Sequence, residues 1–391
     1  MTGMRDRVVD RARGMRDLVR AEAAESERLR TLSAPIVEEM WVSGLMSAFN
    51  PKAAGGVEPS FHEMIETWIE MAWQDGSFGW IGIANLPSTF AAATYLPDEG
   101  FAEIFTRNDN HVTIGGQYFP NGQGAVVDGG YRLSGAWNFG SGTGHSAYIG
   151  AGFFPMDNGE MRWVSEGIPE MRVAFLPREE VTFTDGWHVQ GLKGTGSYDY
   201  NVADLFVPEY RTMPLFTRAP LRGTSAASRM GLMPITAAGH ASFALGVAKS
   251  MLDDVEELAA TKVRMSDMAT LASRPTFQKG LAHHVAAWRA ARLLVIDAFS
   301  AAEAAVDAGG DLTPAMRADM RVAAVYATDT ARSCAEWAHL AAGSTAIREG
   351  SRLERAFRDI YTGTQHAFIS EKVAMDVAQI WLGIIEDQFG L

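Results

Sequence analysis

Cysteine and long apolar runs are nearly absent from the sequence. Cys334 is the single cysteine in 391 residues, so no internal disulfide can form, which fits a reducing cytosol. The apolar run 77–96 contains Asn85 and Pro87 and therefore predicts a buried helix rather than a membrane span. Acidic residues interrupt the arginines near the N-terminus and no apolar segment follows, so we expect no signal peptide. These absences predict a cytoplasmic protein.

Basic residues and metal-binding patterns are also scarce. The formal net charge is −13 at pH 7, which argues against nucleic acid or an anionic membrane as the main partner. HExxH, CxxC and EF-hand patterns are missing. His283 and His284 are neighbours that diverge by about 100° on a helix, so they cannot easily chelate one metal. We therefore expect no metal site, no nucleic acid and no membrane partner.

The remaining composition is that of a folded enzyme. Hydrophobic residues make up 47% of the chain and charged residues 21%, with ten tryptophans, as in soluble globular proteins. Such a length allows two or three domains and a large buried core. Apolar residues at three-to-four spacing in 4–107 predict helices. From about 112 to 207, glycines and short alternating runs predict strands, with a tight turn at 128–130.

Four long alanine- and leucine-rich stretches follow the β region. Their number and length are those of a helical bundle, and they cover residues 237–261, 275–308, 314–342 and 364–388. We therefore predict an α+β protein with an N-terminal helical domain (1–110), a central small β-barrel or sandwich (111–212) and a C-terminal four-helix bundle (213–391).

The C-terminal stretch 355–372 reads RAFRDIYTGTQHAFISEK. It resembles the C-terminal signature of acyl-CoA dehydrogenases, in which R-D…Y-E-G-T carries the catalytic glutamate. Thr362 takes the place of that glutamate, and a threonine cannot take up an α-proton as a carboxylate can. Some members carry the glutamate on a helix aligned near 230–235, but this stretch reads MGLMPI. The dehydrogenase base is missing from both positions.

Arg358, Asp359 and His366 form a pattern that resembles the oxygenase components of two-component flavin-dependent monooxygenases (group D type, similar to p-hydroxyphenylacetate and steroid-phenol hydroxylases). Those enzymes use the acyl-CoA dehydrogenase fold to activate O2, and the helical–β–helical order extends the resemblance over nearly the whole chain. The resemblance implies reduced flavin (FAD or FMN) from a partner reductase and a C4a-hydroperoxyflavin formed with O2. It further implies oxygenation of a small aromatic or other electron-rich substrate, and a homotetramer.

The segment GGYRLSGAWNFGSGTGHSAYIGAGFF (129–154) carries another part of the resemblance. Its N-F-x-S-G form is similar to the same monooxygenases. On that likeness Phe139 backs the flavin ring, and Ser141, followed by Gly142, lies beside flavin N5. A hydroxyl can hold the N5 proton of a reduced flavin by hydrogen bonding. The alternative is a serine in a β-turn between glycines.

Two more segments resemble flavin-contacting parts of this fold. GLKGTGS (191–197) opens no helix and is therefore not a dinucleotide fingerprint; it resembles a turn packed over the flavin, with Thr195 or Ser197 as contacts. The alternative is a plain hairpin turn. Arg274 and Phe277 match an Arg-x-x-Phe that reaches the FAD pyrophosphate of a neighbouring subunit in dehydrogenases, and arginine suits a pyrophosphate. The alternative is a surface arginine near a helix cap.

His366 follows Thr362 by four residues, which on one helix would give both side chains a common face. Beside a flavin, a histidine can deprotonate a phenol or supply a proton to the distal peroxide oxygen; a lone histidine is otherwise a core or surface residue. Some phenol-hydroxylating relatives carry a histidine near position 88, where this chain has a serine. The substrate therefore need not be a phenol, and oxidation at nitrogen or sulfur stays open. Alignment adds further candidates, namely Gln117 and Thr364 beside the flavin and Trp80, Ser88, Tyr118 and Thr362 beside the substrate.

Two other functions remain open on the sequence alone. An acyl-CoA dehydrogenase using FAD would have the same fold, but its base is missing at Thr362. A non-catalytic flavin-fold protein that binds a partner such as DNA would need a basic stripe, which the charge of −13 disfavours. A dehydrogenase bleaches its flavin when acyl-CoA is added, whereas an oxygenase gives a transient near-ultraviolet absorbance when reduced flavin meets O2.

Overall fold

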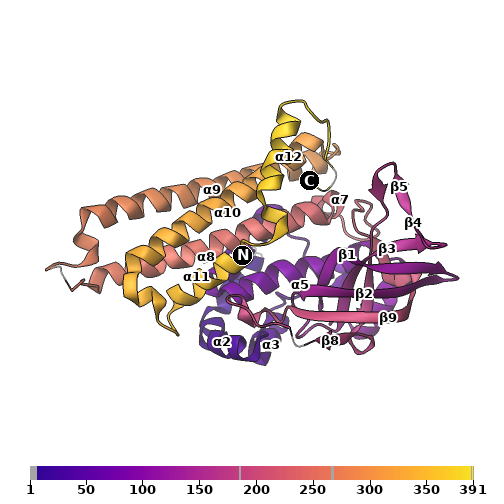
Figure 1. The fold of residues 1–391 in the computed structure, drawn as a ribbon, viewed down its shortest axis with the longest axis horizontal. Coiled ribbons are helices and arrows are strands. Elements are labelled where there is room, and N and C mark those ends of the chain that lie inside the picture. Colours follow the sequence, from indigo (N-terminus) through magenta and orange to yellow (C-terminus); the bar gives the residue numbers. More distant parts are fainter. Residues whose placement is uncertain (1–6, 185, 266–267, 389, 391) are drawn as a thin grey trace, which may run out of the picture.

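Helices from both ends of the chain pack together, and the strands that separate them in the sequence form a sheet at one side of the molecule in the computed structural model (Figure 1). The structure describes residues 7–184, 186–265, 268–388 and 390. Residues 1–6, the start of the expected N-terminal helical region, lie outside the described residues. No helix in the described part of the chain has the length and apolar character needed to cross a membrane.

The N-terminal region is helical, as its apolar spacing predicts. Side chains cap the starts of two consecutive helices, Phe61–Gln74 and Gly76–Tyr95: Ser60 accepts a hydrogen bond from the Glu63 N–H, and Asp75 accepts from the N–H groups of Ser77 and Phe78. The second of these helices contains the run 77–96 and is buried along most of its length. The α-helices are α1 (Val8–Gly14), α2 (Arg16–Leu29), α3 (Ala34–Val42), α4 (Phe61–Gln74), α5 (Gly76–Tyr95) and α6 (Asp98–Ile104).

The central strands form one main sheet in the order β10-β7-β3-β1-β2-β9-β8, with β4 paired to β3, and β5 pairs separately with β6. The predicted turn at 128–130 joins β1 to β2, where Val127 pairs with Gly130. The described strands form no closed barrel, so the barrel form of the prediction is wrong. They are β1 (Ile114–Val127), β2 (Gly130–Gly140), β3 (Tyr148–Asp157), β4 (Glu160–Met161), β5 (Trp163–Ser165), β6 (Ile168–Pro169), β7 (Arg172–Pro177), β8 (Thr182–Thr184), β9 (Tyr198–Pro208) and β10 (Thr212–Pro214).

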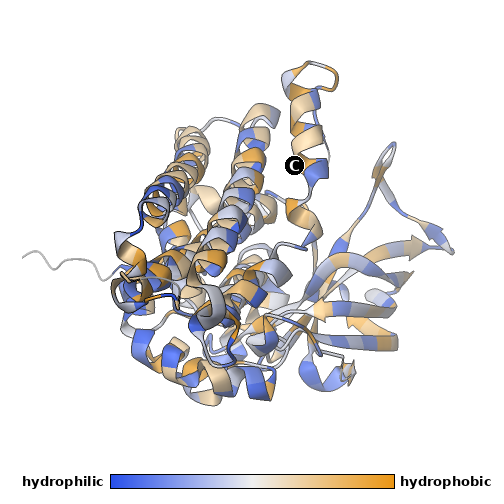
Figure 2. Ribbon diagram, turned by 60° about the vertical axis from the view of Figure 1, so that its left-hand side comes forward, coloured by the Kyte–Doolittle hydropathy of each residue, from blue (hydrophilic) through white to orange (hydrophobic). Residues whose placement is uncertain are grey.

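The C-terminal region contains the three long helices that the sequence predicts, but the fourth is shorter than expected. Within the expected stretch 364–388, a single 3-10 turn (Ala367–Ile369) precedes the α-helix α12 (Glu371–Trp381). The preceding helix α11 ends at Gly363, with Thr364 as its C-cap residue. Most of α8 is buried, while the outer bundle helices carry both hydrophilic and hydrophobic residues (Figure 2). The helices are α7 (Ala226–Met230), α8 (Leu232–Thr261), α9 (Pro275–Asp307), α10 (Pro314–Ala342), α11 (Arg352–Gly363) and α12 (Glu371–Trp381).

The Arg-Asp pair of the C-terminal motif fastens α11 to the turn before β9. Arg358 donates from Nη1 to the carbonyl oxygen of Gln190 at 2.8 Å and forms an ion pair with Glu27 at 3.0 Å. Asp359 accepts a hydrogen bond from the Leu192 N–H at 2.6 Å, and Leu192 has a left-handed backbone with φ 55°. The pair therefore fixes a turn whose shape is unfavourable for leucine.

Asp359 gives a first prediction, on stability. Burial, reinforced by the nearby Asp75 carboxylate, raises the pKa of Asp359 well above its usual range. Stability should therefore fall as pH rises above the ordinary carboxyl pKa, because the unfolded chain then releases a proton that the folded chain retains. Asp359→Asn keeps an acceptor for Leu192 without a charge, so at pH 8 it should melt at or above the wild-type temperature.

The matched variant is Asp359→Ala, which leaves the buried Leu192 N–H without its acceptor and should cost about 1–3 kcal/mol. Thermal unfolding of the three proteins at pH 5 and pH 8 measures both effects. Equal destabilisation by asparagine and alanine at pH 8 would contradict this account of the buried carboxyl.

Candidate active site

Three hydroxyl groups and an indole N–H form a continuous chain of hydrogen bonds between α5, β2 and the turn before β9. Trp80 donates from Nε1 to Ser141 Oγ at 3.0 Å. Ser141 Oγ lies 2.9 Å from Ser197 Oγ, and Ser197 Oγ lies 2.7 Å from Thr195 Oγ1. Thr195 Oγ1 donates to the Leu192 carbonyl oxygen at 2.9 Å. The predicted contacts Ser141, Thr195 and Ser197 are thus brought together.

The ends of this chain fix the position of every proton in it. A carbonyl oxygen can only accept, so Thr195 uses its proton there; Ser197 must then donate to Thr195, and Ser141 to Ser197. The indole N–H can only donate, so Trp80 occupies one lone pair of Ser141. Thr195 and Ser197 are fully buried. Ser141 is left with one lone pair, which can accept a hydrogen bond but cannot donate one.

The C-terminal motif also packs against the ring of Trp80. The Trp80 ring centre lies 5.0 Å from that of Phe243 on α8, in an edge-on contact, and 6.0 Å from that of His366. Gly363 permits this approach, because a Cβ at that position would lie 3.0 Å from Trp80 Cζ3 and 2.3 Å from Phe243 Cε1. The glycine of the Y-T-G-T sequence therefore leaves room for the two rings.

His366 lies beyond the end of α11, so the predicted common helix face with Thr362 is wrong. Its Nδ1 accepts a hydrogen bond from the Phe368 N–H at 3.2 Å, which leaves the proton of a neutral ring on Nε2. The side chain is accessible to solvent, yet the surrounding protein desolvates it and, together with the positive charge of Arg321, lowers the pKa of His366 to about 4. At neutral pH the ring is an uncharged donor at Nε2.

Thr362, which the sequence aligns with the dehydrogenase glutamate, uses its hydroxyl within its own helix. Thr362 Oγ1 donates to the Arg358 carbonyl oxygen at 2.8 Å. A Cβ on Gly191 would lie 2.2 Å from that carbonyl oxygen and 2.6 Å from Thr362 Oγ1. Thr364 is buried, and its hydroxyl has no hydrogen-bond partner among the described residues. The helix end thus offers small hydroxyl groups and no carboxylate.

Phe139 and Gly142 flank Ser141 with unusual backbones. Phe139 has a left-handed φ of 60°, which is uncommon for an aromatic residue and is found at functional sites, and its side chain is 63% exposed. Gly142 has φ +75°, and a Cβ there would lie 2.2 Å from Asn85 Oδ1. This strand end therefore presents a solvent-facing aromatic ring next to Ser141 and tolerates no larger residue at Gly142.

Gln117, Tyr118 and Ser88 form a separate group whose bonds are within the protein. Tyr118 donates from its hydroxyl to the Ser88 carbonyl oxygen at 3.1 Å, and burial raises the pKa of Tyr118 above its usual range. Gln117 donates its N–H to Tyr200 Oη at 2.9 Å, and its side-chain Oε1 accepts from the Phe119 N–H. A backbone hydrogen bond connects this group to the hydroxyl chain: the N–H of Gly116, the residue before Gln117, donates to the carbonyl oxygen of Ser141 at 3.2 Å.

Arg274 and Phe277 are not brought together with Ser141 in one chain. They lie at the start of α9, at the end of the bundle away from the sheet (Figure 1). Phe277 is buried, and its ring centre lies 5.5 Å from that of Trp337 on α10. Any contact with a flavin held near Ser141 would therefore have to come from another copy of the chain.

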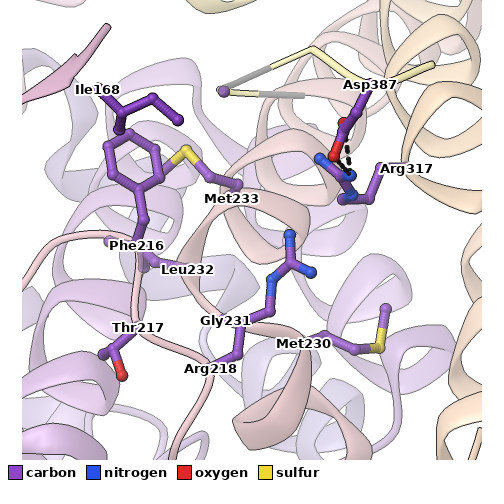
Figure 3. Close-up of a pocket in the computed structure, with 11 residues that line it drawn as sticks. Ile168, Phe216, Thr217, Arg218, Met230, Gly231, Leu232, Met233, Arg317 and Asp387 are labelled. Carbon is purple, nitrogen blue, oxygen red and sulfur yellow. Dashed lines mark hydrogen bonds and ion pairs between the residues drawn. The ribbon is translucent and has the colours of Figure 1, made fainter. Parts of the chain in front are cut away.

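A cavity of about 380 Å³ opens beside the end of α7 and the start of α8. Figure 3 shows the Arg218 guanidinium extending into it beneath the ion pair of Arg317 and Asp387. Phe216, Met230 and Met233 supply apolar walls. None of the residues predicted from the sequence lines this cavity. The hydroxyl chain and His366 lie farther along α8, which contacts them through Phe243 and His240.

His240 is a site residue that sequence reasoning missed. It lies on α8 with only 5% of its surface exposed, and its ring centre is 4.4 Å from that of His366 and 5.4 Å from that of Trp80. The usable signal was a single histidine inside an otherwise apolar helix, in the sequence AAGHASFAL. A lone histidine in such a helix carries no sign of its neighbours, which come from distant parts of the chain.

The fold and the C-terminal helices match known proteins. The sequence pattern of the family "Acyl-CoA dehydrogenase, C-terminal domain" matches residues 238–371. A solved structure of XiaF from Streptomyces sp., in complex with FADH2 and glycerol, superimposes with a TM-score of 0.90 at 23% identity, covering 98% of this chain and 97% of that one. The chain thus has the acyl-CoA dehydrogenase fold, without the carboxylate base at Thr362.

Three relatives cover most of the chain. An indole-3-acetate monooxygenase of Pseudomonas putida is 29% identical over 95% of this chain and 92% of that protein. A pigment production hydroxylase of Rhodococcus erythropolis is 30% identical over 92% of each. A protein of Rhodococcus jostii named flavin-dependent monooxygenase, oxygenase subunit HsaA, is 28% identical over 89% of this chain and 91% of that protein. The chain belongs to this family of flavin-dependent monooxygenases, and it is an oxidoreductase.

Proposed function

We propose that the protein is the oxygenase component of a two-component monooxygenase that takes reduced flavin, FAD or FMN, from a partner reductase. The observation that carries this proposal is the acceptor-only hydroxyl of Ser141, whose hydrogen bonds to Trp80 and Ser197 leave a single lone pair. Reduced flavin carries a proton on N5, whereas oxidised flavin has a lone pair there. Ser141 can therefore bond to the reduced form and has no proton to offer the oxidised one.

The described residues fit a flavin placed at Ser141. The exposed ring of Phe139 and the glycine backbone at Gly142 provide a flat approach beside the hydroxyl, and Thr195 and Ser197 hold the proton of Ser141 away from it. Gln117 and Thr364 are further proposed contacts. Bound reduced flavin would supply the two electrons with which one atom of O2 is transferred to the substrate and the other leaves as water.

His366 is the proposed catalytic histidine. Its neutral ring, with the proton on Nε2, lies beside Trp80, one residue from the hydroxyl chain. The Nε2–H group can donate a hydrogen bond to the oxygen that is transferred and so stabilise negative charge that develops there. Thr362 offers no base because its hydroxyl bonds to Arg358, which disfavours thioester dehydrogenation.

The proposed substrate is a small aromatic or other electron-rich molecule, with Trp80, Ser88, Tyr118 and Thr362 near it. The name of the Pseudomonas putida relative specifies an indole acid, which supports an aromatic class. Whether carbon, nitrogen or sulfur receives the oxygen is left to experiment.

A homotetramer in the cytoplasm is the proposed assembly. Apolar side chains lie exposed on three helices of the bundle, and a second copy would cover them; they include Leu293 and Leu294 on α9, Tyr326 on α10 and Met375 on α12. Such packing would bring Arg274 and Phe277 of one copy toward a neighbouring copy. We propose domain boundaries near residues 110 and 212, with the flavin between the sheet and the bundle.

Flavin binding tests this function directly. The protein should bind reduced FAD or FMN at least about tenfold more tightly than the oxidised form, the factor expected for one hydrogen bond gained. It should not oxidise NADH by itself, because the sequence contains no nicotinamide fingerprint. Anaerobic titration measures the first and NADH absorbance the second. Tight binding of oxidised flavin with steady NADH turnover would overturn the proposal.

A further inference from the structure

His240 combines deep burial with an unused hydrogen-bond acceptor. Its Nδ1 lies 2.9 Å from the Thr236 carbonyl oxygen, one helical turn earlier on α8. A carbonyl can only accept, so Nδ1 carries the proton of the neutral ring and Nε2 carries a lone pair. That Nε2 is buried and has no hydrogen-bond partner among the described residues. A buried acceptor without a donor is costly, and a bound ligand can remove that cost.

The surroundings of His240 keep its ring neutral. Burial lowers the pKa of His240 well below its usual range, and the neighbouring His366 and Arg321 oppose a positive charge there as well. Arg321 lies over the ring of Phe368 at 3.6 Å, and the Phe368 ring centre is 5.6 Å from that of His240. The acceptor at Nε2 is therefore retained at neutral pH.

His240 and His366 have complementary protons. The two ring centres are 4.4 Å apart, yet the His366 ring is protonated on Nε2, since its Nδ1 accepts from Phe368, while the His240 ring is protonated on Nδ1. The pair thus offers one donor and one acceptor. Both rings lie against Trp80, whose indole N–H bonds to Ser141, so a polar group that reached both Nε2 atoms from the edge of this pair would be close to the proposed flavin position.

We propose that His240 is a substrate-recognition residue, whose Nε2 accepts a hydrogen bond from an O–H or N–H group on the aromatic substrate. A phenol hydroxyl would satisfy both histidines, because it donates to His240 and accepts from His366. An indole-type N–H would satisfy His240 alone. An ether or thioether has no proton to donate and leaves the buried acceptor unpaired. The inference rests on the proposed oxygenase function and narrows its substrate class to aromatic donors.

Two isosteric ligand pairs test the recognition by binding alone. Phenol and fluorobenzene differ in one hydrogen-bond donor, as do indole and benzofuran. Dissociation constants are measured by calorimetry on the full-length protein with reduced flavin under anaerobic conditions. Wild type should favour each donor over its isostere, and His240→Phe, which keeps a ring of similar size among aromatic neighbours, should shift that ratio about ten- to hundredfold toward the isostere.

His284→Phe is the matched control. His284 also bonds through Nδ1 to the carbonyl four residues earlier, at 2.8 Å from Gly280, and stacks on Trp337, but it lies on α9 away from the hydroxyl chain. Its variant should keep the wild-type ratio. If His240→Phe does not fold, as judged by its melting curve, His240→Leu takes its place.

An unchanged ratio in the folded His240 variant, or failure of wild type to bind phenol and indole, would overturn the inference. These outcomes are separable from failure of the oxygenase proposal. If reduced flavin does not bind, the proposed function falls, while the same ligand ratios can still be measured on the flavin-free protein and report on His240.

Discussion

Replacing His366 with alanine should slow oxygen transfer to the substrate by about 10²–10³-fold, the loss expected when one hydrogen-bond donor to developing negative charge is removed. The reaction of the bound reduced flavin with O2 should remain nearly unchanged, because the hydroxyl chain through Ser141 does not include His366. Stopped-flow absorbance after mixing with O2 measures the flavin reaction, and quenched samples measure product.

His339→Ala controls for the loss of a partly buried imidazole. His339 stacks on Phe357 at 3.9 Å between α10 and α11, outside the proposed site, so its variant should transfer oxygen at the wild-type rate. A wild-type transfer rate in His366→Ala would show that the histidine of the motif marks only the fold.

Ser141→Ala should uncouple O2 consumption from product formation. The variant loses the acceptor that we assign to the N5 proton, and removal of one partner from a buried hydrogen bond is worth about 1–3 kcal/mol, or roughly ten- to hundredfold in the rate of H2O2 release. Product per flavin oxidised should fall while O2 consumption continues. Oxygen-electrode and peroxide assays, with product quantification, measure this ratio.

Two further serine variants test whether the direction of the Ser141 O–H bond matters, and not only the presence of the Ser141 hydroxyl. Ser197→Ala frees the Ser141 proton, so it should weaken the preference for reduced over oxidised flavin although Ser141 is retained. Ser134 lies on the same strand β2, and its hydroxyl accepts from the Asp204 N–H at 2.9 Å; Ser134→Ala should behave as wild type. Unaltered coupling in Ser141→Ala would require the flavin position to be withdrawn.

The sequence predicts candidate residues in separate segments that the structure brings together. The segments 129–154 and 191–197 lie apart in the sequence, yet Ser141 Oγ and Ser197 Oγ lie 2.9 Å apart in the structure. Helical spacing and turn residues likewise predicted the helical–β–helical order, because these signals are local. The proton order could not be predicted, since it depends on the Leu192 carbonyl and the Trp80 indole, which come from a turn and a distant helix.

The sequence predictions that differ from the structure fail for physical reasons, because hydrophobic periodicity contains no information about contacts between distant parts of the chain. Residues 364–388 have helical spacing, but the α-helix there covers only Glu371–Trp381. The preceding α11 ends at Gly363, where the close approach of Trp80 and Phe243 requires a glycine, and His366 therefore lies outside the helix that carries Thr362. His240 was missed because its importance comes from His366, 126 positions later. Asp359 was recognised only as part of a motif, and its bond to Leu192 shows that it holds a turn.

The contact between Thr362 and Gly191 sets a limit on how this fold changes its chemistry. The threonine hydroxyl lies so near the Gly191 backbone that even an added Cβ on that glycine would approach it to 2.6 Å. The same turn continues into Thr195 and Ser197, which orient the proton of Ser141. A longer side chain that followed the direction of the Thr362 hydroxyl would meet this turn, to which the hydroxyl chain is attached. We therefore expect that a carboxylate at Thr362 keeps the hydroxyl chain in place only if its side chain turns away from Gly191, and that a change of chemistry at this position involves α11 and the facing turn together.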